Sequence, residues 1–355
     1  MTEREKIIAV LNGHIIDEIP IYREGPMDVT VLNELVPGDY ESSPEKLMEY
    51  TSFFGNGTAW LGIDMESETL SRDDRHHTYR YETGAVWHES YDPVFCREAL
   101  AYPVNEPEDA FGFRFSDAGF TTRFDRDKAA DTVRRYKEAG FFVEGSAMGA
   151  FHAIYYFVAS FENILAWMAV EEEAAMALFN ETARYSLESS RVLLDCGVDS
   201  IFVCSDLGSA MSLLFSKAMF RKYMAPWLSE LAGLCHGRGA WLHLHSHGHI
   251  EELMDDFIEC GVDIINPIGP SDHNNLSMFK KKWGDKITFN AGIGTQIAGM
   301  TDDEMKAHVF SVVETGRIGG RFFPRTESGI PPMSREKTLR YLELLKEACR
   351  MGYSR

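Results

Sequence analysis

The chain has little positive charge for its length. Its 355 residues carry 35 Lys and Arg against 55 Asp and Glu, a formal net charge of −20 at neutral pH. Such a surface repels polyphosphates and anionic lipid head groups, so binding of nucleic acid or a membrane surface would need a local basic stripe. The densest basic clusters, at 134–135 and 280–282, are too short for that role. We therefore expect neither nucleic acid nor membrane as a partner.

Long apolar runs, paired cysteines and nucleotide-binding glycines are missing as well. No stretch approaches the length of about 18 apolar residues that suggests a membrane helix, and residues 1–10 lack a secretory-signal pattern. The six cysteines lie singly with no CxxC pair, which is typical of reduced thiols and excludes a disulfide framework or zinc knuckle. No GxGxxG follows a strand pattern, so a dinucleotide site is not supported. We expect a cytoplasmic protein.

After about residue 140 the sequence alternates between two kinds of segment. Short apolar runs predict strands at 141–148, 198–204, 240–245, 262–268, 287–291 and 320–323. Longer runs of helical period predict helices within 162–194, 217–236, 249–259, 276–283, 302–315 and 334–351. Ser277, Thr301 and Ser334 are expected N-caps, and Thr301 has Glu304 in capping-box position. This alternation predicts parallel strands joined by crossover helices.

Two further strand candidates precede this region, at 19–23 and 59–64, and bring the number to eight. Eight parallel strands favour an α/β fold with a single (β/α)8 TIM barrel, and we expect it to span residues 1–355 as one domain. Residues 65–91 alternate polar and apolar side chains around Glu82–Gly84. That pattern predicts an antiparallel hairpin inserted after a barrel strand, as a rim and not a separate domain.

The densest polar motif is WLHLHSHGH at 241–249. Alternate residues of a strand share a face, so His243, His245 and His247 point one way, and in a barrel they face the axis. Two imidazoles spaced by one residue suit a divalent metal, zinc foremost. We predict His245 and His247 as metal ligands. The structural alternative, hydrogen bonding to buried carboxylates and water, is favoured for His243 and His249.

Two other motifs lie where strands end. In VCSDLG, Cys204 and Asp206 share a face, and Asp206 is a candidate metal ligand, orienting group or base; its structural alternative is a helix N-cap. In RTESGIPP, Glu327 is a candidate for completing a site of two histidines and one carboxylate, and an exposed loop carboxylate is the alternative. Further rim candidates for catalysis or substrate binding are Arg23, Glu24, Glu144, Ser146, Asn266 and Asn290.

Several of these segments resemble the uroporphyrinogen decarboxylase superfamily, which also contains corrinoid-dependent methyltransferases. The resemblance covers most of the chain and rests on GFFVEGSAMGAFH, on the run from Cys196 to Leu228, on HSHGHIEELMDDFIECGVDIINPI, on FNAGIGTQ and on SGIPPMSREKTLRYL. It implies a (β/α)8 barrel with its site at the carboxyl ends of the strands.

The two branches of that superfamily differ at three places. The decarboxylases resemble one another in a basic stretch after the first strand, where only Arg23 corresponds here, and in a late Gly-His-Gly, where this chain has Glu327-Ser328-Gly329. The methyltransferases hold zinc with a His-x-Cys pair and a later Cys. Carried over, the His falls on His245, the first Cys on His247, and the second on Ser328 or Glu327. Both thiolates of the family pattern are therefore replaced.

The sequence analysis therefore predicts a methyltransferase that moves a methyl group to or from a corrinoid protein. The expected metal ligands are His245, His247 and Glu327, with Asp206, Glu327 and Arg23 as catalytic groups. A small-molecule methyl donor or thiol acceptor is the expected second partner. Two alternatives stay open: a uroporphyrinogen decarboxylase-like enzyme acting on a tetrapyrrole without metal, and a non-catalytic protein that binds a corrinoid or tetrapyrrole.

Overall fold

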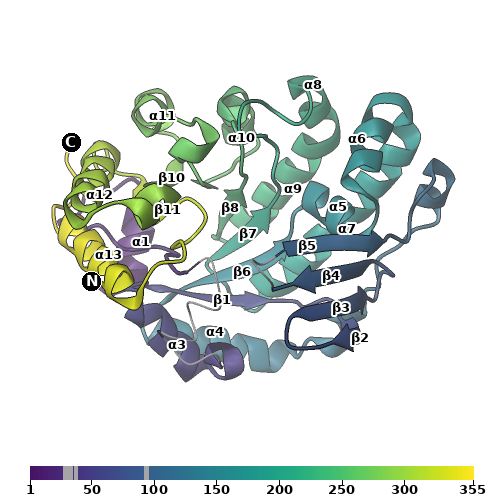
Figure 1. Cartoon of the computed structure of the whole chain (residues 1–355), viewed down its shortest axis with the longest axis horizontal. Helices are drawn as coiled ribbons and strands as arrows, with labels where there is room; N and C mark the ends of the chain where they lie inside the picture. Colours follow the sequence, from purple (N-terminus) through teal and green to yellow (C-terminus); the bar gives the residue numbers. More distant parts are fainter. Residues whose placement is uncertain (27–34, 36–38, 92–95) are drawn as a thin grey trace.

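A curled sheet of seven parallel strands forms the centre of the computed structural model, which describes residues 1–26, 35, 39–91 and 96–355 (Figure 1). In spatial order the strands are β1 (Thr58–Gly62), β6 (Phe142–Met148), β7 (Ser200–Cys204), β8 (Trp241–His245), β9 (Ile264–Asn266), β10 (Thr288–Ile293) and β11 (Phe322–Thr326). Every neighbouring pair is parallel. The predicted parallel α/β organisation is confirmed.

The eighth predicted strand, 19–23, does not pair as a strand within the described residues. It makes one isolated parallel bridge, between Ile21 and Asn56, and Asn290 Nδ2 donates to the Tyr22 carbonyl at 3.2 Å. Pro20 has no N–H to give a ladder, and Arg23 has a positive φ of 59° that ends the extended conformation. The described sheet is thus a seven-stranded half-barrel, where the sequence predicts eight strands.

Helices cover the outside of the sheet, mostly one after each strand (Figure 1). They are α1 (Glu3–Leu11), α3 (Pro44–Phe53), α4 (Arg126–Glu138), α5 (Ala150–Phe157), α6 (Phe161–Val170), α7 (Glu172–Asp195), α8 (Lys217–Met219), α9 (Ala225–His236), α10 (Met254–Glu259), α11 (Leu276–Trp283), α12 (Asp302–Gly316) and α13 (Arg335–Cys349). Thr301 caps α12 in a capping box with Glu304, and Ser334 caps α13, as predicted. The cap of α11 is Asn275, not Ser277.

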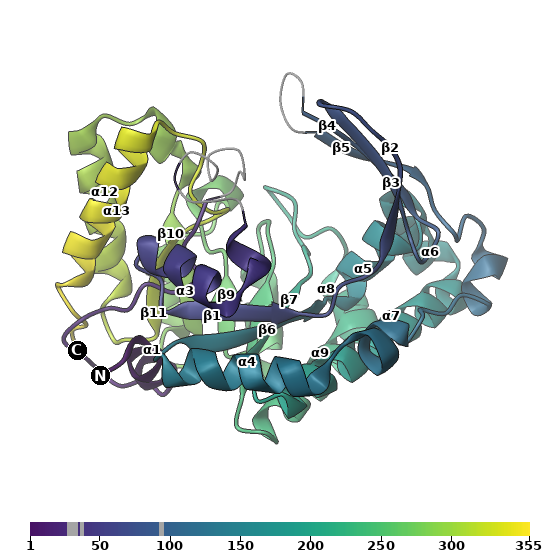
Figure 2. The same ribbon diagram turned by 90° about the horizontal axis from the view of Figure 1, so that it is seen from below.

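The inserted segment is larger than a single hairpin. Four antiparallel strands form it: β2 (Ser67–Arg72), β3 (His76–Tyr81), β4 (Val86–Ser90) and β5 (Cys96–Ala101). β3 and β4 pair around the predicted turn at 82–84. The sheet stands at one side of the fold, opposite α12 and α13 (Figure 2). Trp87 in β4 stacks on Tyr156 in α5, with ring centroids 4.6 Å apart, which fastens the insertion to the main fold.

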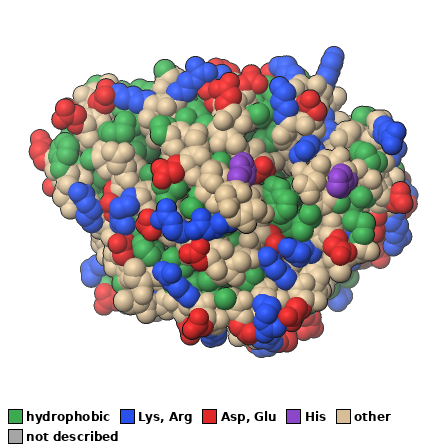
Figure 3. All heavy atoms as spheres, turned by 180° about the vertical axis from the view of Figure 1, so that it is seen from behind, with side chains coloured by type: hydrophobic (Ala, Val, Ile, Leu, Met, Phe, Trp, Pro, Cys, Tyr) green, Lys and Arg blue, Asp and Glu red, His purple; other side chains and the backbone are tan. Residues whose placement is uncertain are grey.

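Acidic and basic side chains are interspersed on the face of the molecule seen from behind (Figure 3). That mixture agrees with the short basic clusters of the sequence, because no long basic stripe crosses this face. Among the described residues, no helix has the length and apolar character needed to span a bilayer.

Candidate metal centre and active site

The sheet register lines up the carboxyl ends of four strands, β6, β7, β8 and β9. Met148 is paired with Cys204, Cys204 with His245, and His245 with Asn266. Side chains at the ends of β7 and β8 therefore meet. Cys204, Asp206 and His245 each offer a donor atom within 4.8 Å of the others, and they are the one such cluster of three or more possible ligands within the described part of the chain. Asp206 is not a helix cap, since α8 is capped by Ser216.

His245 is held as a neutral imidazole. Burial lowers its pKa well below the ordinary value, and His247 and Arg325 add positive charge that lowers it further. Its Nε2 lies 3.7 Å from Oδ1 of Asp206, and its Nδ1 is buried with no hydrogen-bond partner among the described residues. Burial and the Asp206 charge raise the pKa of the Cys204 thiol. A neutral imidazole and a thiol that a cation can deprotonate are suitable ligands for zinc.

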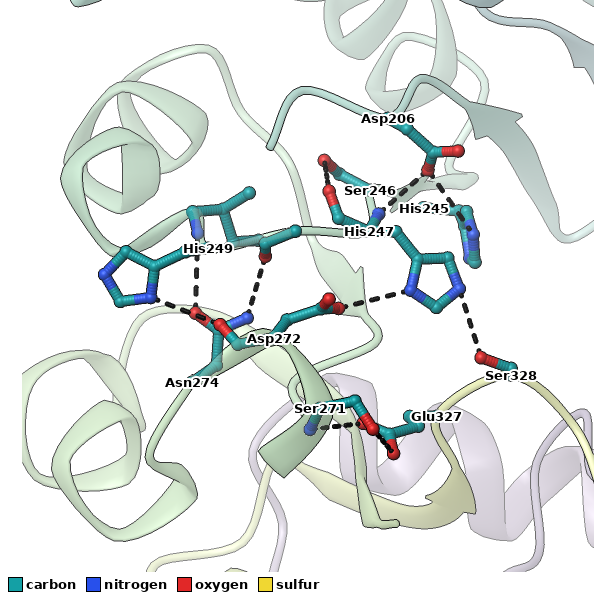
Figure 4. Close-up of polar contacts among 12 residues, drawn as sticks. Asp206, His245, Ser246, His247, His249, Ser271, Asp272, Asn274, Glu327 and Ser328 are labelled. Atoms are coloured by element: carbon teal, nitrogen blue, oxygen red, sulfur yellow. Dashed lines mark hydrogen bonds and ion pairs between the residues drawn. The ribbon is translucent and has the colours of Figure 1, made fainter. Parts of the chain in front are cut away.

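His247 lies beside this cluster and is oriented by a carboxylate (Figure 4). The ring centroids of His245 and His247 are 4.9 Å apart. His247 Nδ1 lies 3.2 Å from Oδ2 of Asp272, and Nε2 lies 3.4 Å from the Ser328 hydroxyl. Burial lowers the pKa of His247, but the hydrogen bond to Asp272 and the Asp206 charge outweigh it, so the pKa is raised. The two predicted histidines are thus neighbours.

Glu327, the predicted third metal ligand, follows β11 and is hydrogen-bonded to two other loops. Its carboxylate accepts hydrogen bonds from Ser271 N at 3.1 Å, Ser271 Oγ at 2.6 Å and Thr295 N at 3.0 Å. It turns toward Ser271 (Figure 4), and its side chain is 1% exposed. In the part of the chain that the structure describes, it does not belong to the cluster of close donor atoms. The structure therefore does not bring the donor atoms of His245, His247 and Glu327 together as one set of ligands.

His243 is part of a buried hydrogen-bond network inside the sheet. Its Nδ1 lies 2.9 Å from Oε2 of Glu144, and its Nε2 lies 2.7 Å from Oδ1 of Asn266. Glu144 also accepts from Tyr22 and pairs with Arg23. The network supports the structural assignment of His243. Its hydrogen bonds also fix the positions of Glu144 and Asn266, two residues predicted for the site.

The remaining predicted residues lie around this network or beyond it. Asn290 donates to the carbonyls of Tyr22 and Phe323. His249 Nδ1 lies 3.2 Å from the Asp272 carbonyl, which agrees with a structural role. Ser146 faces open space, where it lines two cavities.

Two adjoining cavities lie at this end of the sheet. One, of about 410 Å³, is lined by polar residues that include Arg23, Glu144, Ser146, Arg325 and Ser328. The other, of about 620 Å³, is lined mainly by apolar residues that include Trp60, Met148, Phe157 and Phe202, and it reaches Cys204. Trp60 and Ser146 line both. The site therefore consists of a charged cavity and an adjoining apolar cavity, and the apolar cavity reaches the donor cluster at Cys204.

The family of the chain follows from a sequence comparison. The model of the uroporphyrinogen decarboxylase (URO-D) family matches residues 126–345, more than half of the chain. The chain belongs to this family. The match covers β6 to β11, which carry the donor cluster and both histidines. Among curated proteins, no sequence matches the chain.

Solved structures were compared with the fold of this URO-D family chain, and one of them shares it. A methyltransferase from Methanosarcina mazei superimposes with a TM-score of 0.70 at 14% identity, covering 98% of each chain. A putative vitamin-B12 independent methionine synthase from Listeria monocytogenes gives a TM-score of 0.47 at 11% identity, covering 88% of this chain and 85% of the other. At these identities, the first likeness concerns the fold alone.

Asp272 and Arg325 were not predicted as site residues. Arg325 lies two positions before Glu327, so strand parity could have placed both on one side of the sheet. Asp272 lies in a short turn, Pro270–Asp272, after β9. No local pattern indicates that a carboxylate in such a turn reaches His247, because the contact depends on how two loops fold back at the same rim.

Proposed function

We propose that this URO-D family protein is a methyltransferase that moves a methyl group to or from a corrinoid carried by a partner protein, assisted by a divalent metal. The donor cluster of Cys204, Asp206 and His245 beside an apolar cavity is the observation that carries the proposal. The shared fold with a Methanosarcina methyltransferase supports it. A small-molecule methyl donor or thiol acceptor would occupy the cavity.

The residues present fit a zinc ion. Cys204, Asp206 and His245 would supply sulfur, oxygen and nitrogen ligands. His247 lies outside that cluster of close donor atoms, as Glu327 does. We assign His247 as a fourth ligand through Nε2, because its ring lies 4.9 Å from that of His245 and Asp272 holds its Nδ1. The cysteine positions of the methyltransferase pattern are replaced by His247 and Ser328 or Glu327. Cys204, from the neighbouring strand, would return one thiolate to the site and make it softer than histidines and carboxylates alone.

The chain's own groups would prepare the reaction. A bound zinc ion lowers the pKa of a thiol or water that it binds. Trp60, Phe157 and Phe202 line the cavity with apolar surface, which excludes water from a reacting group. Asp272 fixes the orientation of the His247 ring. The guanidinium carbon of Arg23, which lines the charged cavity, lies 3.6 Å from the centroid of the Phe202 ring, which lines the apolar one.

Metal analysis of purified variants tests the ligand assignment. We expect stoichiometric zinc in the wild type and in Cys96→Ser, which changes an exposed cysteine outside the donor cluster. We expect loss of zinc in Cys204→Ala and in His245→Ala. With cobalt in place of zinc, the near-ultraviolet absorption band of a thiolate ligand should be absent in Cys204→Ala and present in Cys96→Ser. Equal metal content in all four proteins would contradict the assignment.

Methyl transfer is measured separately, by the change in absorbance of methylcobalamin when a thiol is added. Turnover by the wild type, with none by His245→Ala, is the expected result. Cobalamin binding without methyl transfer to any thiol tested would instead favour a non-catalytic corrinoid-binding protein.

Decarboxylation of a tetrapyrrole is the second candidate, favoured by Arg23 and Arg325 in the charged cavity. Two guanidinium groups match one carboxylate better than the eight of a porphyrinogen, so this candidate ranks second. Incubation with uroporphyrinogen and detection of coproporphyrinogen would establish it.

A further inference from the structure

Arg325 in β11 is half-buried, and its side chain lines the charged cavity of about 410 Å³. Its Nε is buried and has no hydrogen-bond partner within residues 1–26, 35, 39–91 and 96–355, and no ion pair of its guanidinium is found there. Burial lowers the pKa of Arg325, and the nearby Arg23 lowers it further. An arginine carries five N–H donors, and leaving the buried Nε–H of Arg325 without a partner costs free energy.

The two carboxylates of this cavity are already engaged by other groups. Glu144 accepts from Tyr22, Ser200 and His243 and pairs with Arg23.

Glu24 is engaged in the same way. It accepts from Thr326 N at 2.8 Å, Thr326 Oγ1 at 2.7 Å and Tyr341 OH at 2.7 Å. Both carboxylates therefore serve the fold. The donors of Arg325 are left to whatever enters the cavity.

The surroundings of Arg325 describe the shape of a ligand. Ser146 and Ser328 add hydroxyl groups to the same cavity, and Arg23 adds a second guanidinium. Trp60 and Ser146 also line the adjoining apolar cavity, whose lining includes Phe202 and Cys204. A molecule with an oxyanion at one end and an apolar body would reach from Arg325 to the donor cluster.

We propose that Arg325, with Arg23 beside it, binds the carboxylate or sulfonate head of a small organic anion whose apolar body lies along Trp60 toward Cys204. A planar guanidinium pairs with such oxyanions through two parallel hydrogen bonds. The inference rests on the proposed function in that the anion is the small-molecule methyl donor or acceptor. Its test needs neither corrinoid nor turnover, so a failure of methyl transfer would leave the binding result intact.

Calorimetric and ligand-observed NMR titrations with simple probes test the inference. We expect benzoate or benzenesulfonate to bind the wild type and neutral benzamide, of the same shape, to bind at least about tenfold more weakly, because it lacks the charge. Benzoate and benzenesulfonate together distinguish a carboxylate from a sulfonate site. This comparison uses the wild type alone, so it decides even if a variant fails to fold.

Variants then assign the site to Arg325. Arg325→Met should lose anion binding by about tenfold or more, and Arg325→Lys should keep part of it, because charge remains without the planar fork. Arg134→Met removes an exposed arginine of α4 and should bind as the wild type does. Equal binding of benzoate and benzamide, or benzoate binding unchanged in a folded Arg325→Met, would overturn the proposal.

Discussion

Glu144 and His243 join two strands that are not neighbours in the sheet. Oε2 of Glu144 in β6 lies 2.9 Å from Nδ1 of His243 in β8, across β7, and the two side chains are 1% and 0% exposed. Burial by itself would raise the pKa of Glu144, but Arg23 and His243 outweigh it and hold the pKa well below its usual range. The interior of the sheet therefore contains an ionised carboxylate, and its ion pair with Arg23 holds that side chain at the charged cavity.

Glu144→Gln should destabilise the protein at neutral pH by about 3 kcal/mol, the low end for breaking a buried ion pair. Because the folded pKa is depressed, the contribution of Glu144 is present above about pH 4.3 and is lost as the pH falls below it. The difference in unfolding free energy between wild type and variant, measured with urea, should thus narrow in acid. Glu138→Gln, at an exposed position, serves as the control, and a difference independent of pH would contradict the prediction.

Gly248→Ala should disturb the loop that carries His247. Gly248 has a φ of +97°, and a Cβ there would lie 2.1 Å from the backbone of Gly208, which lies against it. No small movement relieves a contact between two backbones, so we expect a loss of more than about 1 kcal/mol in unfolding free energy, together with weaker metal binding. Gly233→Ala, where nothing lies within 4 Å of the new Cβ, should be as stable as the wild type or more so.

The periodicity of the sequence predicts the strands and the side of the sheet that their side chains face. It therefore also predicts that side chains at the ends of β7 and β8 lie close together. Cys204 and His245 meet because neighbouring strands pair at those residues. Glu327 could not be placed in the same way. Its position depends on hydrogen bonds from Ser271 and Thr295, which lie in loops after two other strands, and loop conformations of this kind are set by non-local contacts that no local pattern encodes.

Asp272→Asn should weaken metal binding without removing any ligand. The carboxylate holds Nδ1 of His247 at 3.2 Å, and loss of such an outer partner typically costs about 10–100-fold in metal affinity. Competition with a chelator of known affinity measures the change. Asp303→Asn, an exposed residue in the first turn of α12, should leave the affinity unchanged. An Asp272→Asn protein that binds zinc as tightly as the wild type would mean that His247 is not a ligand.

Glu327→Gln separates the two possible ligand sets. In the structure Glu327 joins the loops after β9 and β10 through three accepted hydrogen bonds, and an amide can accept at only one of its two terminal atoms. The variant should therefore lose about 1–3 kcal/mol of stability, since buried donors are left unpaired, while a folded preparation keeps its metal. If zinc is lost from folded Glu327→Gln and retained in Cys204→Ala, the set of His245, His247 and Glu327 holds the metal. The opposite result assigns it to Cys204, Asp206 and His245.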